Sequence, residues 1–185
     1  MTTLIVDNSS SFSNNLFFLT SFKQKVIKEN YSQVNIDKLN AYDSIILSGR
    51  KKVLKDTNLI NSKIIKYCYQ TDTPLLGICY GAEIINLNFG GSLIKMNKVI
   101  EGFQKITTLK ECLSMPKDFS FAAYQSHGYA ISKISNELEN LAISSENKVE
   151  IFKHVNKNIF GFQFHPEISG KIGKVLLYYF LNLSR

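Results

Sequence analysis

The segment PLLGICYGAE, residues 74–83, decides the fold of this chain. A short apolar run ends at Cys79, and a segment with helical periodicity follows it. Gly77 and Gly81 stand two positions before and two positions after Cys79, in the pattern G-x-nucleophile-x-G. This pattern is typical of a sharp turn that joins a buried strand to a helix in α/β proteins and exposes the side chain at its tip. The segment therefore predicts a strand, a strained elbow at Cys79 and a helix.

Similar elements are predicted on both sides of this segment. Short β-branched runs at residues 4–7, 44–47, 75–79, 119–124 and 159–164 predict buried strands, and residues 16–28, 58–69, 82–89 and 172–183 have helical periodicity. Such alternation predicts an α/β fold with a mostly parallel central sheet between two layers of helices. Between residues 92 and 150 the apolar runs are shorter and alternate, as at 105–109 and 149–153, which predicts a small antiparallel addition.

Length and composition agree with one globular domain over residues 1–185. Apolar residues make up 44% of the chain and charged residues 20%, so a full core is expected and disorder is not. The net charge is +7, but the lysines are scattered, and only Arg50, Lys51 and Lys52 form a small basic group, which argues against nucleic acid as a partner. No apolar stretch approaches the length of a membrane span, and no export signal is recognisable.

Three cysteines indicate the compartment and one candidate nucleophile. Cys68, Cys79 and Cys112 have no CxxC spacing, and an odd number does not form a closed disulfide framework. A reducing cytoplasm is therefore expected, and a metal site has little support. Cys68 and Cys112 have no base at a readable spacing, which predicts packing roles for both.

Polar residues follow three of the predicted strands where functional sites of open α/β sheets lie, beyond the carboxyl ends of the strands. These are Ser48-Gly49-Arg50, Cys79-Tyr80-Gly81 and His165-Pro166-Glu167. At the elbow, the amino terminus of the following helix is expected to lower the thiol pKa of Cys79 below its ordinary value of about 8.5. The alternative for Cys79 is a buried structural cysteine between two turn glycines.

The run FQFHPE, residues 162–167, supplies a base and an acid two positions apart. If the strand continues through Pro166, His165 and Glu167 project to the same side and touch. His165 then takes the proton of the Cys79 thiol and later returns it to the leaving group, while Glu167 orients the imidazole. The alternative is a histidine at a strand end whose ring is bonded to backbone. Together the two motifs predict a catalytic triad of Cys79, His165 and Glu167.

The elbow combined with FQFHPE resembles the class I (triad-type) glutamine amidotransferases, over nearly the whole chain. Residues 125–128 and 149–154, QSHG and VEIFKH, make the amidotransferase subunit of GMP synthetases the most similar branch. The resemblance implies a flavodoxin-like three-layer sandwich and a cytoplasmic glutaminase that hydrolyses glutamine to glutamate and ammonia through a Cys79 thioester. It also implies an ATP-pyrophosphatase-type synthetase partner, which receives the ammonia for GMP synthesis from XMP. ATP and magnesium would belong to the partner, and no cofactor is expected in this chain.

The resemblance also assigns residues around the nucleophile. Backbone N–H groups of Tyr80 and Arg50 are expected to form the oxyanion hole, and the substrate-binding residues are expected to be Gly49, Glu83, Gln125, Ser126 and His127. Arg50 and Lys51 replace a glycine and a proline of the family's S-G-G-P-like loop. If Arg50 needs a positive φ to direct its N–H into the site, the hole is expected to stay unformed until a partner or ligand reorganises the loop.

A second departure leaves the reaction partly open. Ala82-Glu83 replaces the usual His-Gln. Glu83 is expected to pair with the α-ammonium of glutamine, and the alternative is a favourable interaction of its negative charge with the amino terminus of the helix. Glutamate at this position is also found in γ-glutamyl hydrolases, so hydrolysis of other γ-glutamyl compounds is one alternative. The others are an amidotransferase subunit for anthranilate or aminodeoxychorismate synthesis and a non-catalytic regulatory relative.

Overall fold

The computed structural model describes residues 1–52 and 55–183. Within these ranges the strands form one nine-stranded sheet with the order β2-β1-β3-β4-β9-β8-β7-β5-β6. Residues 53–54 and 184–185 of the domain predicted over 1–185 lie outside the described ranges.

One half of the sheet is parallel. It contains β1 (Thr2–Asp7), β2 (Lys25–Asn30), β3 (Ser44–Leu47), β4 (Leu75–Ile78) and β9 (Ile159–Phe162). Every residue of β3, β4 and β9 is buried, as expected where helices cover both faces of a parallel sheet. The central strands are therefore short apolar runs, as the sequence indicates.

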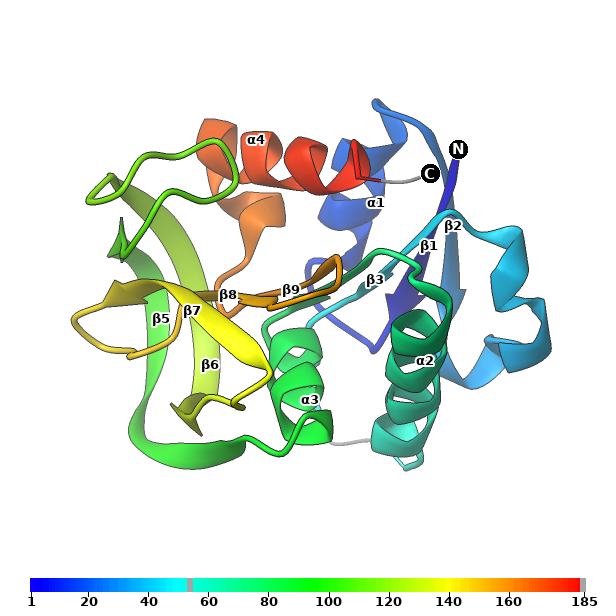
Figure 1. Ribbon diagram of the computed structural model, residues 1–185, viewed down its shortest axis with the longest axis horizontal. Coiled ribbons are helices and arrows are strands. Elements are labelled where there is room, and N and C mark those ends of the chain that lie inside the picture. The colour runs from blue at the N-terminus through cyan, green and yellow to red at the C-terminus, as the bar shows by residue number, and fades with distance from the viewer. Residues whose placement is uncertain (53–54, 184–185) are drawn as a thin grey trace.

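The other half is antiparallel. It contains β8 (Ile151–His154), β7 (Leu138–Ser144), β5 (Ser92–Thr108) and β6 (Ser120–Lys133), of which β8 pairs with β9. The long strands β5 and β6 form a curved ribbon at this end of the sheet (Figure 1). The antiparallel part is thus more extensive than the short runs predicted, and residues 119–124, predicted as a separate buried strand, lie mostly at the start of β6.

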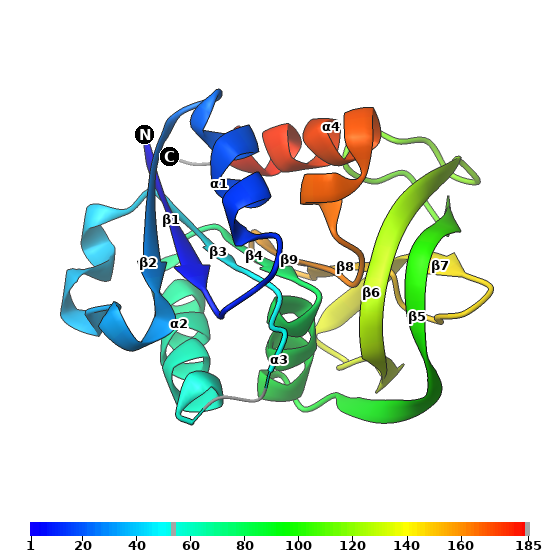
Figure 2. The same ribbon diagram turned by 180° about the vertical axis from the view of Figure 1, so that it is seen from behind.

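Helices cover both faces of the parallel half (Figures 1 and 2). Helices α1 (Ser13–Ser21) and α4 (Gly170–Leu181) lie on one face, and α2 (Thr57–Thr71) and α3 (Tyr80–Asn88) lie on the other. Ile5 packs in the first of two buried clusters, with Phe180 of α4, while its neighbour Leu4 packs in the second, with Ile64 of α2. This alternation along β1 builds a core on each side of the sheet and confirms the predicted three-layer α/β sandwich.

One predicted element is wrong. Residues 16–28 were expected to form a single helix, but α1 ends at Ser21 and Lys25–Asn30 form the edge strand β2. Residues 25–30 pair in parallel with β1, and this pairing satisfies backbone groups that local periodicity does not reveal. Three short 3₁₀ helices complete the described fold, at Tyr31–Gln33, Ile36–Ala41 and Pro166–Ile168.

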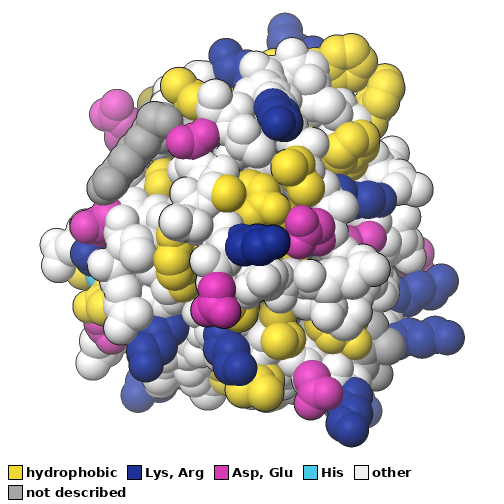
Figure 3. Space-filling view, turned by 90° about the vertical axis from the view of Figure 1, so that its right-hand side faces the viewer, with side chains coloured by type: hydrophobic (Ala, Val, Ile, Leu, Met, Phe, Trp, Pro, Cys, Tyr) yellow, Lys and Arg dark blue, Asp and Glu magenta, His cyan; other side chains and the backbone are white. Residues whose placement is uncertain are grey.

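The surface beside β2 carries charges of both signs. In the view of Figure 3, Lys and Arg side chains are interspersed with Asp and Glu and do not merge into one basic patch. Across residues 1–52 and 55–183, no helix has the length and apolar character needed to cross a bilayer.

Candidate active site

Three neighbouring strands end at the same edge of the sheet and direct the predicted polar segments to one place. Leu47 of β3 pairs with Gly77 of β4, and Gly77 pairs with Gly161 of β9. The loops after these strands begin at Ser48, at Cys79 and at Gln163. The convergence expected from the sequence therefore occurs, because parallel strands in register end together.

The elbow at Cys79 is strained in the way that the motif predicts. Cys79 has φ 51° and ψ −108° immediately before α3, a backbone conformation that residues other than glycine rarely adopt. A Cβ on Gly77 would overlap the backbone of Gly81, and a Cβ on Gly81 would overlap the carbonyl oxygen of Leu47. Both glycines are thus required for the close approach of strand and helix that holds Cys79 in this conformation.

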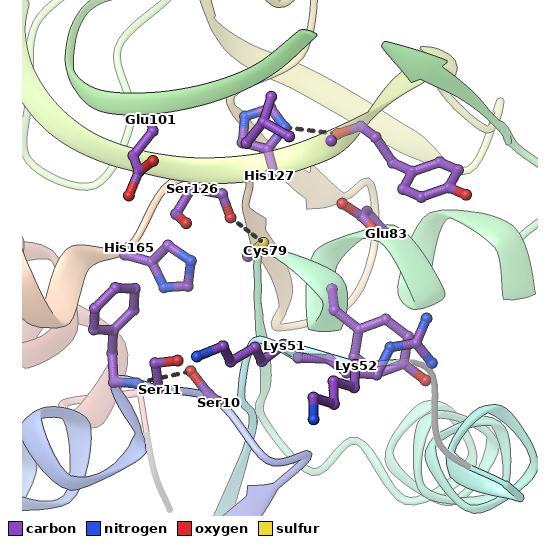
Figure 4. A pocket seen from close by; sticks show the side chains of 16 residues that line it. Ser10, Ser11, Lys51, Lys52, Cys79, Glu83, Glu101, Ser126, His127 and His165 are labelled. Atoms are coloured by element: carbon purple, nitrogen blue, oxygen red, sulfur yellow. Dashed lines mark hydrogen bonds between the residues drawn. The ribbon is translucent and has the colours of Figure 1, made fainter. Parts of the chain in front are cut away.

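A cavity of about 430 Å³ lies over the elbow. Its walls come from the β1–α1 loop, the loop after β3, the elbow, the β5–β6 ribbon and the segment after β9. The lining residues are Ser10, Ser11, Phe12, Arg50, Lys51, Lys52, Cys79, Tyr80, Glu83, Val99, Glu101, Ser126, His127, Gly128, Tyr129 and His165. Figure 4 shows Cys79 at the base of this cavity, with His165 on one side and Glu83 on the other.

His165 and Glu167 touch through a turn and not through a continued strand. Strand β9 ends at Phe162, and Pro166–Ile168 form a 3₁₀ helix. Nδ1 of His165 lies 2.8 Å from Oε1 of Glu167, and both side chains are buried. The backbone N–H of His165 donates to the carbonyl oxygen of Tyr124 at 2.8 Å, which anchors the base to β6. The predicted contact exists, although its expected strand geometry is wrong.

The surroundings of Gly49 show that His165 and Cys79 lie close together. A Cβ placed on Gly49 would lie 2.9 Å from Cε1 of His165 and 3.7 Å from Cβ of Cys79. The imidazole edge and the cysteine therefore face the same small space beside the β3 loop (Figure 4). The Cys79 thiol donates to the carbonyl oxygen of Ser126 at 3.8 Å, a long and weak interaction that leaves the sulfur available to the imidazole.

The resting charge of the sulfur differs from the expectation. Burial raises the pKa of the Cys79 thiol well above its usual range, and the carboxylate of Glu83 raises it further. The backbone N–H of Tyr80 lowers the pKa, as a helix amino terminus should, but this effect is smaller than that of burial. The expected depression of the thiol pKa is therefore wrong for the cavity without substrate, where the sulfur is a neutral thiol at pH 7.

Glu83 is a buried carboxyl group of the same cavity. Only 8% of its surface is exposed, and its Oε1 accepts a hydrogen bond of 3.1 Å from Nε2 of Gln163. Burial raises the pKa of Glu83 to about 7, against the lowering effects of Gln163, Arg50 and His165. The group is thus poised to change its charge when a cation enters the cavity.

The predicted substrate residues of β6 occupy two layers. Ser126 and His127 line the cavity, while Gln125 is fully buried and bonded to other side chains. Its amide donates to Oε2 of Glu150 at 2.8 Å, and its Oε1 lies 2.9 Å from Nε2 of His127. Nδ1 of His127 lies 2.7 Å from the carbonyl oxygen of Tyr129. Burial lowers the pKa of His127, and a neutral ring donates to only one of these oxygens at a time.

One expected oxyanion donor, Arg50, lies in the loop after β3, and the other, Tyr80, is the first residue of α3. Arg50 and Tyr80 both line the cavity, and Arg50 is not among the described non-glycine residues with positive φ. The positive φ considered for this position is therefore not adopted, and the expectation that a partner or ligand reorganises the loop stays a prediction. The assignment of the Tyr80 and Arg50 N–H groups to an oxyanion hole stays a prediction.

Several residues of the site were not singled out from the sequence. The ring of Phe12 packs at 4.8 Å against the ring of His165, Gln163 bonds to Glu83, and Asn58 and Glu150 accept hydrogen bonds from predicted site residues. For Glu150 a signal was present, because a charged residue between the apolar Val149 and Ile151 must find buried partners. In the described part of the chain, no group of three or more His, Cys, Asp or Glu residues is arranged to hold a metal ion.

The description "Glutamine amidotransferase class-I" belongs to the family model that matches residues 4–182. The chain belongs to this family. The chain is 33% identical over 137 residues to a subunit of the glutamine-hydrolysing GMP synthase of Picrophilus torridus, covering 74% of this chain and 73% of that protein. Its fold matches the solved structure of a putative GMP synthase subunit from Thermoplasma acidophilum with a TM-score of 0.87, at 22% identity and covering 98% of this chain and 92% of that one. The predicted resemblance and fold are confirmed, and so is the expectation of an amidotransferase enzyme.

Other relatives of this amidotransferase have different names or lengths. The GMP synthase of Aquifex aeolicus is 30% identical over 150 residues, covering 79% of this chain but only 28% of that longer protein. Component 2 of anthranilate synthase from Saccharolobus solfataricus is 30% identical over 195 residues and 97% of both chains. A γ-glutamyl-CDP-amidate hydrolase of Campylobacter jejuni is 32% identical over 129 residues, covering 70% of this chain and 57% of that protein. These relatives share the family and differ in the reactions that their names describe.

Proposed function

We propose that this amidotransferase hydrolyses glutamine to glutamate and ammonia through a thioester at Cys79. The observation that carries the proposal is the meeting of Cys79 and His165 beside Gly49, with Glu167 bonded to the far nitrogen of the imidazole. A nucleophile, a base and a group that orients the base are the parts that covalent amide hydrolysis requires.

The first half of the reaction forms the thioester. Because the resting sulfur is a neutral thiol, Nε2 of His165 takes its proton as the sulfur attacks the side-chain carbonyl carbon of glutamine. Glu167 holds the proton on Nδ1 and stabilises the imidazolium that forms. The amide N–H groups of Tyr80 and Arg50 bind the oxyanion, and each such donor typically lowers the barrier by about 3 kcal/mol. Collapse breaks the C–N bond, and His165 returns the proton to the leaving ammonia.

The second half releases glutamate. With ammonia gone, His165 is neutral again and takes a proton from a water molecule that attacks the thioester carbon. The same two N–H groups bind the second oxyanion. Its collapse breaks the C–S bond and frees glutamate, while His165 gives the proton taken from water to the leaving sulfur and restores the thiol. Glu83 and the Ser126–His127 segment hold the α-ammonium and α-carboxylate end of glutamine, which favours the productive position of the amide over Cys79.

The ammonia is proposed to pass to an ATP-pyrophosphatase-type synthetase that aminates XMP to GMP. The support for this acceptor is the likeness to a subunit of a glutamine-hydrolysing GMP synthase, and ATP with magnesium would act on that partner. Glutamate release from glutamine is measured with and without the candidate synthetase, XMP and ATP·Mg²⁺, alongside Cys79→Ala. Glutamine-dependent GMP formation supports the assignment. Turnover retained in Cys79→Ala would contradict the assignment of Cys79 as the nucleophile. If the chain supports anthranilate formation with the synthase partner of that reaction, and no GMP formation, the proposed acceptor is wrong.

A second candidate is hydrolysis of a γ-glutamyl compound with an anionic group on its nitrogen. It is favoured by the buried Glu83 and by Lys51 and Lys52 at the cavity, opposite Glu101 in Figure 4. The likeness to the hydrolase of Campylobacter jejuni agrees with it. Comparing kcat/KM for glutamine and for a γ-glutamyl phosphoramidate decides between the two: partner-independent preference for the anionic compound supports this candidate. Absence of turnover with either compound, with or without partner, supports a non-catalytic relative.

A further inference from the structure

Arg50 and Tyr80 are joined by their side chains as well as by their place beside the sulfur. The guanidinium carbon of Arg50 lies 3.8 Å from the centroid of the Tyr80 ring, so the cation rests on the aromatic face. Arg50 follows β3 and Tyr80 begins α3, so the contact of their side chains joins these two segments at the cavity.

A third residue, from α2, binds both of them. Nη1 of Arg50 donates to Oδ1 of Asn58 at 3.1 Å, and the phenol of Tyr80 donates to the same oxygen at 2.7 Å. Burial raises the pKa of Tyr80 to about 12, so its phenol keeps the proton that this bond needs. One amide oxygen therefore closes a triangle of three side chains from three different segments.

The triangle exists only because Arg50 has a side chain. A glycine at this position could make neither the stack on the Tyr80 ring nor the guanidinium hydrogen bond to Asn58. Arg50 has no positive φ, so the arginine costs no backbone strain there. A stacked and hydrogen-bonded side chain can hold a loop in one conformation, because its contacts offset the conformational entropy that the loop loses on ordering.

We propose that Arg50 and Asn58 are positioning residues that latch the loop after β3 onto Tyr80 and thereby fix the spacing of the two oxyanion N–H donors. This proposal rests on the proposed glutaminase function, because the latch is expected to change the stability of the transition state of glutamine hydrolysis. An oxyanion hole acts through preorganised donors, so loosening one donor weakens binding of the transition state more than binding of glutamine.

The charge of Arg50 makes a different contribution, which the variants must separate from the latch. The guanidinium lowers the pKa of Cys79 and of Glu83 by its positive charge. Arg50→Lys keeps a positive charge but loses the planar stack and the directed bond to Asn58. Asn58→Leu keeps Arg50 itself and removes the shared acceptor, while Asn58→Asp keeps an acceptor oxygen at the same place.

The test measures glutaminase kinetics and backbone amide exchange in the same variants of the whole chain. We expect Arg50→Lys and Asn58→Leu to lower kcat by about tenfold or more, part of the roughly 10²–10³-fold that a lost oxyanion donor costs, with KM changed little. Amide exchange at residues 49–52 should quicken in both variants, and Asn58→Asp should restore kcat and slow exchange. Lys63→Ala, which removes an exposed lysine five positions after Asn58 on α2, should behave as the unchanged chain.

Each outcome of this test either supports or overturns the latch. If Asn58→Leu keeps the original kcat and the original exchange at residues 49–52, the latch is overturned. If Arg50→Lys is fully active while an uncharged Arg50→Met is not, charge explains the arginine and the latch is also overturned. If the unchanged chain hydrolyses no glutamine either alone or with the candidate synthetase, the proposed function fails, and exchange still decides the latch: faster exchange in Asn58→Leu supports it and equal exchange overturns it.

Discussion

Nδ1 of His165 lies 2.8 Å from Oε1 of Glu167, and this contact fixes which ring nitrogen carries the proton. A carboxylate accepts hydrogen bonds, so Nδ1 is the protonated nitrogen of the neutral ring and Nε2 keeps its lone pair. The lone pair is the part of the imidazole that takes a proton from Cys79. The pair therefore determines the direction of proton transfer before any substrate binds.

Glu167→Gln should nearly abolish glutaminase turnover. The amide of the new side chain can donate to Nδ1 and favour the opposite tautomer, which puts a proton where the lone pair is needed, and a comparable change in serine triads costs about 10⁴-fold in kcat. Glutamate release at saturating glutamine measures the loss. Glu111→Gln, an exposed carboxylate of the β5–β6 connection, is the control and should have the original kcat. A Glu167→Gln variant within about twofold of the unchanged chain would falsify the orienting role.

Glu83→Gln should make the Cys79 sulfur more reactive at neutral pH when no substrate is present. The carboxylate of Glu83 raises the pKa of Cys79, second only to burial, so its removal lowers that pKa and raises the thiolate fraction. The rate of iodoacetamide alkylation at Cys79, followed by peptide mass from pH 6 to pH 10, should shift toward lower pH. Glu101→Gln changes another carboxylate of the same cavity and should leave the profile in place. An unshifted or upward-shifted profile in Glu83→Gln would contradict the electrostatic assignment.

Glu83 should also make the folded state less stable as pH rises. Its pKa is raised from 4.5 to about 7 by burial, so the folded chain binds the proton more tightly than the unfolded chain does. The stabilising effect of the protonated form is complete below about pH 4.5 and is lost as pH rises through 7, a change of roughly 3 kcal/mol at most. Urea unfolding of the unchanged chain and of Glu83→Gln at pH 5 and pH 8 measures it. The variant should lose less free energy of unfolding between these pH values, and equal losses would exclude Glu83 as the cause.

Strands β1, β3, β4 and β9, and the meeting of Cys79, His165 and Glu167 at their ends, were readable from the sequence because their signals are local. Gly77 and Gly81 mark the elbow, and FQFHPE places a base at the end of a buried strand. The edge strand β2 was not readable, because Lys25–Asn30 become a strand only by pairing with β1. Its side chains are partly exposed, so local periodicity did not separate it from α1.

The electrostatics of the site were less predictable than its composition. The helix amino terminus at Tyr80 lowers the thiol pKa as expected, but burial and Glu83 raise it by more, and neither burial nor distance is readable from spacing. Asn58 is another example, because nothing in residues 58–69 beyond helical periodicity indicates that its amide oxygen binds Arg50 and Tyr80. Such contacts depend on the packing of α2 beside α3, which is a tertiary property.

Gly49→Ala should lower turnover without unfolding the protein. The new methyl group would lie 2.9 Å from Cε1 of His165 and 3.4 Å from Oγ of Ser10, so it must displace the imidazole beside Cys79. A misplaced base of this kind costs about 10²-fold in kcat, while the absence of a positive φ at Gly49 spares the backbone. Steady-state kinetics together with the thermal midpoint separate the two effects. Unchanged kcat with an unchanged midpoint would mean that the ring is not held where the structure places it.

Glu150→Gln should destabilise the fold from a position behind the cavity. Oε2 of Glu150 accepts from Gln125 at 2.8 Å, and Oε1 accepts from Ser144 at 2.7 Å and from Asn147 at 2.9 Å. Because donors face both oxygens, the amide group of a glutamine must point its NH₂ at one of them in either orientation, which leaves buried donors unpaired at about 1–3 kcal/mol. Urea unfolding measures the loss, with the exposed neighbour Glu146→Gln as the matched control. If both variants unfold at the same urea concentration, the carboxylate of Glu150 is not the acceptor that holds Gln125. Another group must then fix the position of Gln125 beside His127.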